Sequence, residues 1–253
     1  MGRWMRLPIE ASAHAHAVDE MIVSVHWLIA GIALIFGVFF LICLIRFNRR
    51  ANPAARYRGV APRIAWIFVS AITAVELWEL FFVAIPLWAS RVSNFPSGPE
   101  VTVIRVVAEQ FAWNIHYPGA DGKFGRTDAS LITPDNPLGL DRLDPPAKDD
   151  IFTINEFYFP SGKPVLVQLT SKDVIHSFSL PQMRVKQDAI PGMMIPVWFV
   201  PTVTTPDGER WEINCSQLCG LAHYRMRGLY RSMTPADFKQ FLDDETAALK
   251  AGS

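Results

Sequence analysis

An uncharged apolar run near the N-terminus constrains this chain more than any other feature. From Ile22 to Ile45, no side chain carries a charge. At about 1.5 Å of rise per residue, a helix of this length crosses the roughly 30 Å hydrocarbon core of a bilayer. A cleaved signal peptide is the alternative, but its apolar region is shorter, and arginines follow here in place of a small-residue cleavage pattern. The run therefore predicts a membrane helix over about 22–47, preceded by an N-terminal tail at 1–21.

A second apolar run predicts another membrane helix over about 64–90. It contains Glu76 and Glu79, and carboxyl groups at such depth are costly unless they face protein or water. We interpret them as contacts with a partner protein or as part of a proton path, and contact is the simpler role. The two runs together predict a transmembrane hairpin over 22–92. A buried hairpin of a soluble protein is the alternative interpretation.

The connection between the two runs is basic. It contains no acid and six arginines, namely Arg46, Arg49, Arg50, Arg56, Arg58 and Arg63. Because cytoplasmic loops are enriched in Arg and Lys, this loop is predicted to be cytoplasmic. In a bacterial inner membrane, both termini and everything after about residue 91 are then expected on the periplasmic side.

The net charge of zero hides an asymmetry. Residues 1–98 carry nine Arg and Lys against five acids, whereas residues 99–253 carry fifteen against nineteen. A mildly acidic outer part repels nucleic acid and favours a basic protein as partner. Such a basic partner could be steered by three acids of this outer part, Glu109, Asp173 and Glu212.

The pattern changes after a linker at 93–99, S-N-F-P-S-G-P. Short alternating segments rich in β-branched and aromatic residues follow, separated by turn residues. They predict strands at 101–107, 111–117, 151–159, 164–170, 197–200 and 210–214. This pattern is typical of an all-β sandwich or barrel, which we expect over 100–233.

Two segments lie outside the predicted strands. Residues 118–150 are rich in Pro, Gly and Asp and predict a long surface excursion. Its D-G-K-F-G-R-T-D sequence does not fit a calcium-binding EF-hand loop. The start of a helix is predicted at Thr234, Pro235 and Asp237. Thr234 suits the N-cap, Pro235 the first helical position and Asp237 the third. A C-terminal helix and tail are therefore expected over 234–253.

The strongest chemical signal is the segment C-S-Q-L-C-G-L-A-H-Y-R-M at 215–226. Soft sulfur ligands combined with imidazole favour copper or zinc, and Met is a poor zinc ligand. His176, in D-V-I-H-S-F after the strand at 164–170, supplies a second imidazole. A rigid site with no open position suits electron transfer. A disulfide between Cys215 and Cys219 is the alternative.

At these residues the chain resembles subunit II of the cytochrome c oxidases. The segment 215–226, D-V-I-H-S-F and V-K-Q-D-A-I-P-G at 185–192 carry the resemblance, which extends over both helices and the β domain. It implies a cupredoxin-like domain with a binuclear copper centre, CuA. In that centre two thiolates bridge the copper ions, each imidazole binds one ion, a thioether is a weak ligand and a backbone carbonyl completes the set. The corresponding residues are Cys215, Cys219, His176, His223, Met226 and Gln217.

The resemblance also implies a function and partners. The chain would be the subunit of a respiratory haem–copper oxidase that takes electrons from a cytochrome c-type donor. It would pass them to haem in subunit I, where oxygen is reduced to water with proton translocation. The enzyme would then be an oxidoreductase, and this chain would carry electron entry rather than the oxygen chemistry. The implied partners are subunits I and III, the donor and the lipid membrane.

Three departures from the family pattern change these expectations. Gln217 stands where Glu usually helps to hold Mg²⁺, and its neutral amide binds a hard cation more weakly, so magnesium is doubtful. Phe111 stands where the electron-accepting Trp is expected, while Trp113 remains. Both are candidates for electron transfer, and the donor could be a membrane-bound cytochrome c or an alternative complex III. Residues 61–66, A-P-R-I-A-W, lack the Glu expected at a proton-channel mouth.

Rival functions make different demands on the sequence. A quinol-oxidase subunit of the same architecture lacks copper, and the intact ligand set argues against it. A copper-storage or copper-delivery protein would have exposed, Met-rich sites. A structural ectodomain would use the two cysteines as a disulfide. The chain contains no C-x-x-C-H, so no covalently attached haem is expected.

Overall fold

The computed structural model describes residues 5–54, 59 and 61–252. It divides into a helical unit, mainly Ala17–Ser90, and a β unit formed by Pro8–His16 and the chain from Arg91 onward. Arg56 and Arg58, which contribute to the predicted basic loop, lie outside the described residues.

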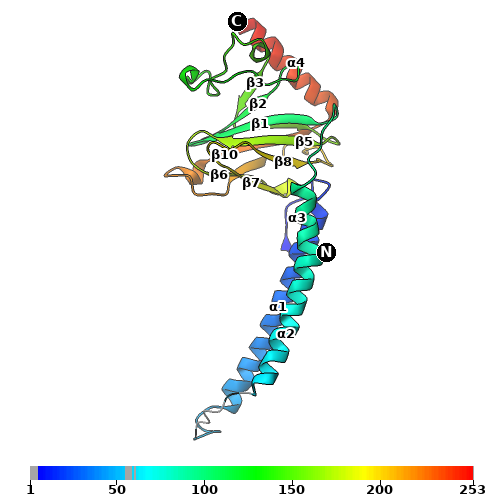
Figure 1. Ribbon diagram of the computed structural model, residues 1–253, viewed down its shortest axis with the longest axis vertical. Coiled ribbons are helices and arrows are strands. Elements are labelled where there is room, and N and C mark those ends of the chain that lie inside the picture. Colours follow the sequence, from blue (N-terminus) through cyan, green and yellow to red (C-terminus); the bar gives the residue numbers. More distant parts are fainter. Residues whose placement is uncertain (1–4, 55–58, 60, 253) are drawn as a thin grey trace. The chain divides into compact units, whose positions relative to one another are not determined.

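Two long helices make up the described part of the helical unit (Figure 1). Helix α1 is Ala15–Arg46, and the second helix consists of α2 (Pro62–Glu79), a π-helical segment η2 (Leu80–Ala84) and α3 (Ile85–Val92). Both are long and apolar enough to cross a membrane. No residue in the most apolar stretch of either helix is buried, unlike the core helix of a soluble protein.

Local chemistry explains the wider turn in the second helix. Pro86 lacks an N–H group, and its ring crowds the carbonyl four residues back. The N–H of Ile85 bonds to the carbonyl of Leu80, five residues back, and this i−5 bond defines a π turn. One residue before this segment, Glu79 accepts a 2.5 Å hydrogen bond from Ser24 of α1. A membrane carboxyl group thus has a partner inside the hairpin.

The predicted N-terminal tail at 1–21 requires a correction. Helix α1 begins at Ala15 rather than at residue 22, because charged residues end a membrane span without ending a helix. The preceding arm, Pro8–His16, belongs to the β unit. Ala11 donates its N–H to the carbonyl of Gln182 at 3.0 Å, and Ala13 donates to that of Val200 at 2.9 Å. The small side chains of Ala11 and Ala13 allow the backbone to pack this closely. They do not form a periodic apolar pattern, so the sequence pattern does not reveal the contact.

Ten strands form two five-stranded sheets in the β unit (Figure 1). The first sheet has the order β3-β2-β1-β5-β8, and the second has the order β4-β10-β9-β6-β7. The strands of the first sheet are β1 (Thr102–Glu109), β2 (Ala112–Tyr117), β3 (Ile151–Ile154), β5 (Val165–Ser171) and β8 (Ile195–Phe199). Those of the second are β4 (Glu156–Pro160), β6 (His176–Leu180), β7 (Val185–Ala189), β9 (Trp211–Cys215) and β10 (Arg227–Met233).

The core lies between the two sheets. Strand β5 alternates between buried and partly exposed residues along its whole length, which is the pattern of a sheet with one face in the core. The largest buried side chains are aromatic, including Trp113, Phe157, Phe159, Phe178 and Phe199. This arrangement is the sandwich that the alternating segments predict.

Two features of the strands depart from the predicted pattern. The segment 151–159 is divided at Asn155, whose φ of 60° is left-handed, a conformation that Asn tolerates better than most residues. The chain changes sheets there, from β3 to β4. Strands β6, β7 and β10 were not predicted, because their polar residues weaken the alternation.

The excursion between β2 and β3 covers the outer face of the first sheet. Leu138, Leu140 and Ala147 form a small apolar cluster against Val107 and Phe152. The excursion contains two short 3-10 helices, η3 (Ala129–Leu131) and η4 (Pro146–Lys148). It is therefore a packed element and not a free surface loop.

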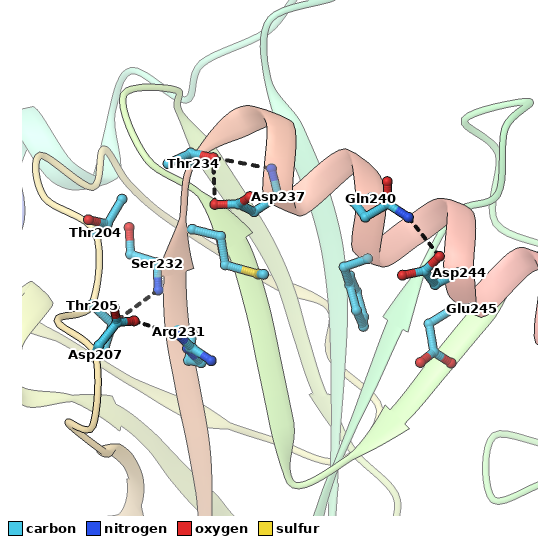
Figure 2. A pocket seen from close by; sticks show the side chains of 12 residues that line it. Thr204, Thr205, Asp207, Arg231, Ser232, Thr234, Asp237, Gln240, Asp244 and Glu245 are labelled. Carbon is cyan, nitrogen blue, oxygen red and sulfur yellow. Dashed lines mark hydrogen bonds and ion pairs between the residues drawn. The ribbon is translucent and has the colours of Figure 1, made fainter.

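Helix α4, Pro235–Gly252, follows β10. The Thr234 hydroxyl accepts the N–H of Asp237 at 3.1 Å and donates to its carboxylate at 2.7 Å, as Figure 2 shows. This reciprocal cap fixes the start of the helix. Phe241 packs its ring against Tyr117 and Tyr158, with centroid distances of 5.6 and 4.7 Å.

Candidate metal centre

The candidate centre forms where β6 and β9 lie side by side. Cys215 ends β9, and its register partner in β6 is Phe178. The N–H of Ser216 bonds to the carbonyl of Ser177 at 2.9 Å. This pairing brings His176, at the start of β6, next to the beginning of the segment 215–226.

The segment 215–226 returns its remaining ligands to the same place. After Cys219 it makes a 3-10 turn, η6 (His223–Arg225), before β10 begins. The N–H of Met226 bonds to the carbonyl of His223 at 3.1 Å, and Met226 in turn accepts a 3.4 Å bond from the N–H of Cys215. The loop therefore closes on itself at the two strand ends.

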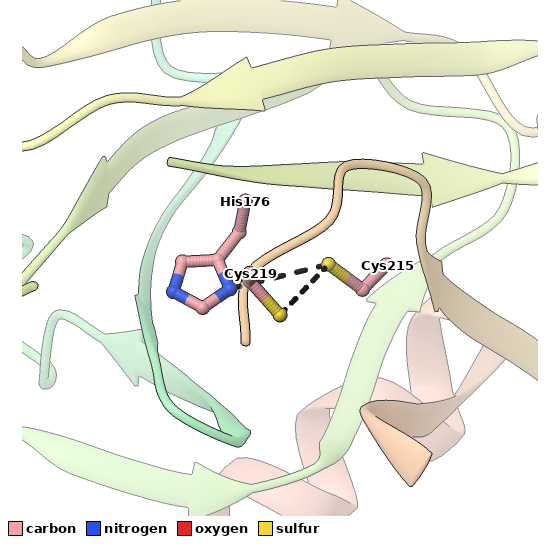
Figure 3. Close-up of side chains that lie close together, drawn as sticks. All are labelled: His176, Cys215 and Cys219. Atoms are coloured by element: carbon pink, nitrogen blue, oxygen red, sulfur yellow. Dashed lines mark hydrogen bonds between the residues drawn. The ribbon is translucent and has the colours of Figure 1, made fainter. Parts of the chain in front are cut away.

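The donor atoms of the candidate ligands are in mutual contact. The Cys215 and Cys219 sulfurs are 3.8 Å apart, and Nδ1 of His176 lies 3.9 Å from the Cys215 sulfur. Figure 3 shows these three side chains converging. Their ligand atoms all lie within 4.8 Å of one another.

The remaining candidate ligands extend this cluster. The Met226 sulfur lies 3.1 Å from Nδ1 of His176 and 3.6 Å from the Cys219 sulfur. Nδ1 of His223 lies 3.5 Å from the Cys219 sulfur. The backbone carbonyl of Gln217 lies 3.2 Å from the Cys215 sulfur. The structure thus brings all six sequence-predicted ligands together, and both thiols are free.

Three of the six candidate ligands are shielded from solvent, while Cys215 and His223 are half-buried and Gln217 is exposed. His176 is fully buried, and Cys219 and Met226 are each 3% exposed. Soft sulfur donors with imidazole nitrogen suit copper, so this cluster is compatible with a copper site. Buried donors on two strand ends and a closed loop also have little freedom to move.

The two thiols differ in their protonation. Burial raises the pKa of the Cys219 thiol to about 11, and the neighbouring charge on Cys215 adds to this effect. Burial is the largest single influence on Cys215 and disfavours its ionisation, but hydrogen bonds with His176, with the backbone of Ser177 and Gln217 and with Cys219 together outweigh it and lower its pKa to about 6. The pair therefore holds one thiolate readily. The second thiolate needs a compensating cation, as metal ligation supplies.

Two polar side chains hold the ligands from outside. Oδ1 of Asp173 lies 2.9 Å from Nε2 of His176, and Oδ2 accepts the N–H of Gln110 at 2.7 Å. The Gln110 side chain donates to the carbonyl of Cys219 at 2.5 Å. Asp173 thereby connects a ligand on β6 to the turn between β1 and β2. Sequence reasoning identified Asp173 only as a nearby acid and missed Gln110.

The two aromatic candidates for electron transfer lie at different depths. Trp113 is fully buried, with its ring centroid 6.1 Å from that of His176. Phe111 is half-buried beside the loop, where a Cβ on Gly220 would come within 3.2 Å of its ring. Phe111 is therefore the outer of the two, and Trp113 packs against the centre from within.

The acids expected to steer a basic donor are already paired. Glu109 binds Lys172 at 2.6 Å, Glu212 lies 3.3 Å from Arg227, and Asp173 is bonded to His176. Large apolar side chains are instead exposed on the loop itself: Leu218, Leu221 and Tyr224 are 78%, 96% and 82% exposed. Pairing with Lys172 and Arg227 thus reduces the field that Glu109 and Glu212 offer to a partner.

Together, the fold and site define a class of protein: a cupredoxin-like β-sandwich that follows two membrane-length helices and carries a copper-compatible cluster of Cys, His and Met. Residues 102–232 match the family described as cytochrome c oxidase subunit II, periplasmic domain. The chain therefore belongs to the cytochrome c oxidase subunit II family.

Several known proteins are similar to this chain. The alternative cytochrome c oxidase subunit 2 of Bradyrhizobium diazoefficiens is 31% identical over 230 residues, covering 90% of this chain and 80% of that protein. Cytochrome c oxidase subunit 2 of Cereibacter sphaeroides is 29% identical over 228 residues, covering 80% and 70%. Among solved structures, the periplasmic domain of cytochrome oxidase subunit II of Bradyrhizobium japonicum is 30% identical, with a TM-score of 0.44, and covers 62% of this chain and 99% of that domain.

Proposed function

We propose that this chain is the electron-accepting subunit of a respiratory haem–copper oxidase and that it holds a binuclear copper centre. The observation that carries the proposal is the contact of two thiols, two imidazoles, a thioether and a carbonyl, linked by distances of 3.1–3.9 Å. A mononuclear site with four ligands would leave some of these donors unused.

Each donor has a role in the proposed centre. Cys215 and Cys219 lie centrally and would bridge the two metal positions. His176 lies on the Cys215 and Met226 side, and His223 lies on the Cys219 side. The Met226 sulfur and the Gln217 carbonyl would complete the two positions. A bound pair of copper ions would supply reversible one-electron transfer.

The protein environment suits electron transfer rather than substrate chemistry. Burial excludes water from His176, Cys219 and Met226. Asp173 fixes one nitrogen of the His176 ring, which leaves Nδ1 directed at the sulfurs. We infer that Phe111 provides the outer electron path and that Trp113 supports His176 from the core.

The helices and charges support a placement for the domain. The arginines between α1 and α2 would face the cytoplasm, and the β unit would face the periplasmic side of a bacterial inner membrane. Subunits I and III would contact the hairpin, and Glu79 already has Ser24 as a partner within it. A cytochrome c or an alternative complex III would donate electrons. The Gln217 side chain, as a neutral amide, offers weak support for Mg²⁺.

The test uses the full chain in detergent, reduced, loaded with copper and desalted. We expect two copper ions per chain, visible thiolate charge-transfer bands, and an EPR hyperfine pattern from one electron shared by two nuclei. Cys43→Ser should behave like the unaltered chain, because Cys43 lies in α1. One copper ion with an ordinary tetragonal signal, or no copper after full reduction, would refute the proposal.

A further inference from the structure

The turn between β1 and β2 lies directly against the segment 215–226. It consists of Gln110 and Phe111. The Gln110 side chain donates to the carbonyl of Cys219 at 2.5 Å. A Cβ on Gly220 would lie 2.6 Å from Nε2 of Gln110 and 3.2 Å from the Phe111 ring. Both turn residues therefore lie close to the peptide that joins Cys219 to Gly220.

Other hydrogen bonds hold the turn in place without help from this contact. Glu109, at the end of β1, pairs with Lys172 at 2.6 Å and accepts from the Asn114 amide at 2.9 Å. The N–H of Gln110 donates to Asp173 at 2.7 Å. The backbone of Gln110 is thus fixed before its side chain reaches the segment 215–226. A donor that is already in position loses little conformational freedom when it bonds.

The Cys219 carbonyl differs from its neighbours in where it finds a donor. Within the segment, the carbonyls of Gly220 and His223 accept the N–H groups of His223 and Met226, at 3.1 Å each. The Cys219 carbonyl instead accepts from the turn. Cys219 is buried, and a buried carbonyl that loses its donor is unfavourable. The Gln110 amide therefore ties this candidate ligand to the first sheet.

Gln110 itself is exposed, which separates its hydrogen bond from the packing of the core. Replacing it removes the donor without opening a cavity among the aromatic side chains of the sandwich. An effect of such a replacement on the metal centre would come from the lost hydrogen bond and not from a loosened core.

We propose that Gln110 is a positioning residue for the copper centre and acts through the Cys219 ligand. The inference rests on the proposed function, because it assumes that two thiolates bridge a pair of copper ions. The amide holds the Cys219 peptide still, so that the ligand moves little when an electron arrives or leaves. The positive end of its N–H dipole points toward the ligand and stabilises the reduced, more electron-rich centre, since hydrogen bonds around a cysteine ligand tune the potential of a copper site.

The experiment compares two variants of the full chain in detergent, loaded with copper. Gln110→Met keeps much of the side-chain length but has no donor, and Gln110→Asn keeps the amide but is one carbon too short to reach the carbonyl. Both should still bind two copper ions, since the six candidate ligands remain. We expect a lower reduction potential, an altered EPR hyperfine splitting and about tenfold weaker copper binding against a chelator. Gln240→Met, at an exposed position on α4, should match the unaltered chain.

Hydrogen exchange of the copper-free, reduced chain tests the same role without metal. The N–H groups of His223 and Met226 should exchange about tenfold faster in Gln110→Met, because the segment 215–226 opens more readily once its tie to the turn is lost. If the unaltered chain binds no copper pair, the proposed function fails, and this measurement still decides the role of Gln110.

An unaltered potential and EPR spectrum in Gln110→Met would overturn the proposal, whatever happens to the melting temperature. Unaltered hydrogen exchange in that variant would also overturn it. The same holds if Gln110→Asn behaves like the unaltered chain, since its amide does not reach the Cys219 carbonyl.

Discussion

Asp173 and His176 are joined by a 2.9 Å hydrogen bond from the ring Nε2 to the carboxylate Oδ1. The opposite ring nitrogen faces the Met226 and Cys215 sulfurs. The Asp173 side chain therefore sets the orientation of His176, a candidate ligand that lies outside the loop 215–226. Asp173 also accepts the N–H of Gln110, so the same carboxylate connects the two sheets at the site.

Replacing Asp173 with Asn should weaken metal binding without unfolding the domain. The amide preserves shape but loses the charge-assisted bond to His176, and loss of such an orienting partner lowers metal affinity by about 10- to 100-fold. Competition for copper against a chelator measures the effect. Asp207→Asn is the matched control, because Asp207 is exposed and its nearest cation, Arg231, lies 3.8 Å away. Unchanged affinity in Asp173→Asn would contradict the role.

Gly220→Ala should destabilise the β unit more than Gly208→Ala. Both glycines have positive φ, at 139° and 80°, and such backbone strain costs a residue with a side chain about 1–3 kcal/mol. At Gly220 the new Cβ would also lie 2.6 Å from Nε2 of Gln110, whereas Gly208 faces open space. Thermal unfolding should show the larger loss for Gly220→Ala, at roughly 2–4 °C per kcal/mol. Equal losses of thermal stability in the two variants would show that the Gln110 side chain moves away from the new Cβ without cost.

Oxidation of the thiol pair should block copper uptake. The Cys215 and Cys219 sulfurs are 3.8 Å apart, so diamide, a two-electron oxidant, can convert two thiols into one disulfide. The oxidised chain is expected to bind no copper at this centre until dithiothreitol restores both thiols. Copper per chain, measured with a count of free thiols, follows the change. Copper uptake at this centre by the fully oxidised protein would show that the Cys215 and Cys219 thiols are not needed to bind copper.

His14 should make the β unit less stable as pH falls. Burial first, and then the positive charge of Arg91, lower its pKa from 6.5 to about 4. The unfolded chain therefore takes up this proton more readily than the folded chain, and stability declines as pH falls from about 6.5 toward 4. Above pH 6.5 the residue is neutral in both states and contributes no such loss.

Two variants on the N-terminal arm isolate this effect. His14→Gln should flatten the decline in melting temperature between pH 6.5 and 4. His16→Gln should retain it, because the His16 side chain is 67% exposed and lies beside Glu10 at 3.3 Å. The same slope in the unaltered chain and in His14→Gln would assign the pH dependence to other groups.

The sequence alone determined the features that depend on neighbouring residues. The membrane-length helices follow from the length of two apolar runs, and the start of α4 follows from Thr234 and Asp237. The segment 215–226 predicted the metal chemistry because four donor side chains lie within it. Alternation predicted the sandwich because each strand buries one face.

Only the tertiary structure decided the features that depend on residues distant in the chain. His176 and Met226 are 50 residues apart, and their contact requires β6 to pair beside β9. The burial of Trp113, the docking of the N-terminal arm and the hydrogen bond from Gln110 to Cys219 likewise arise from packing between separate segments. Composition and periodicity describe what one segment can bury, but they do not specify which other segment will cover it.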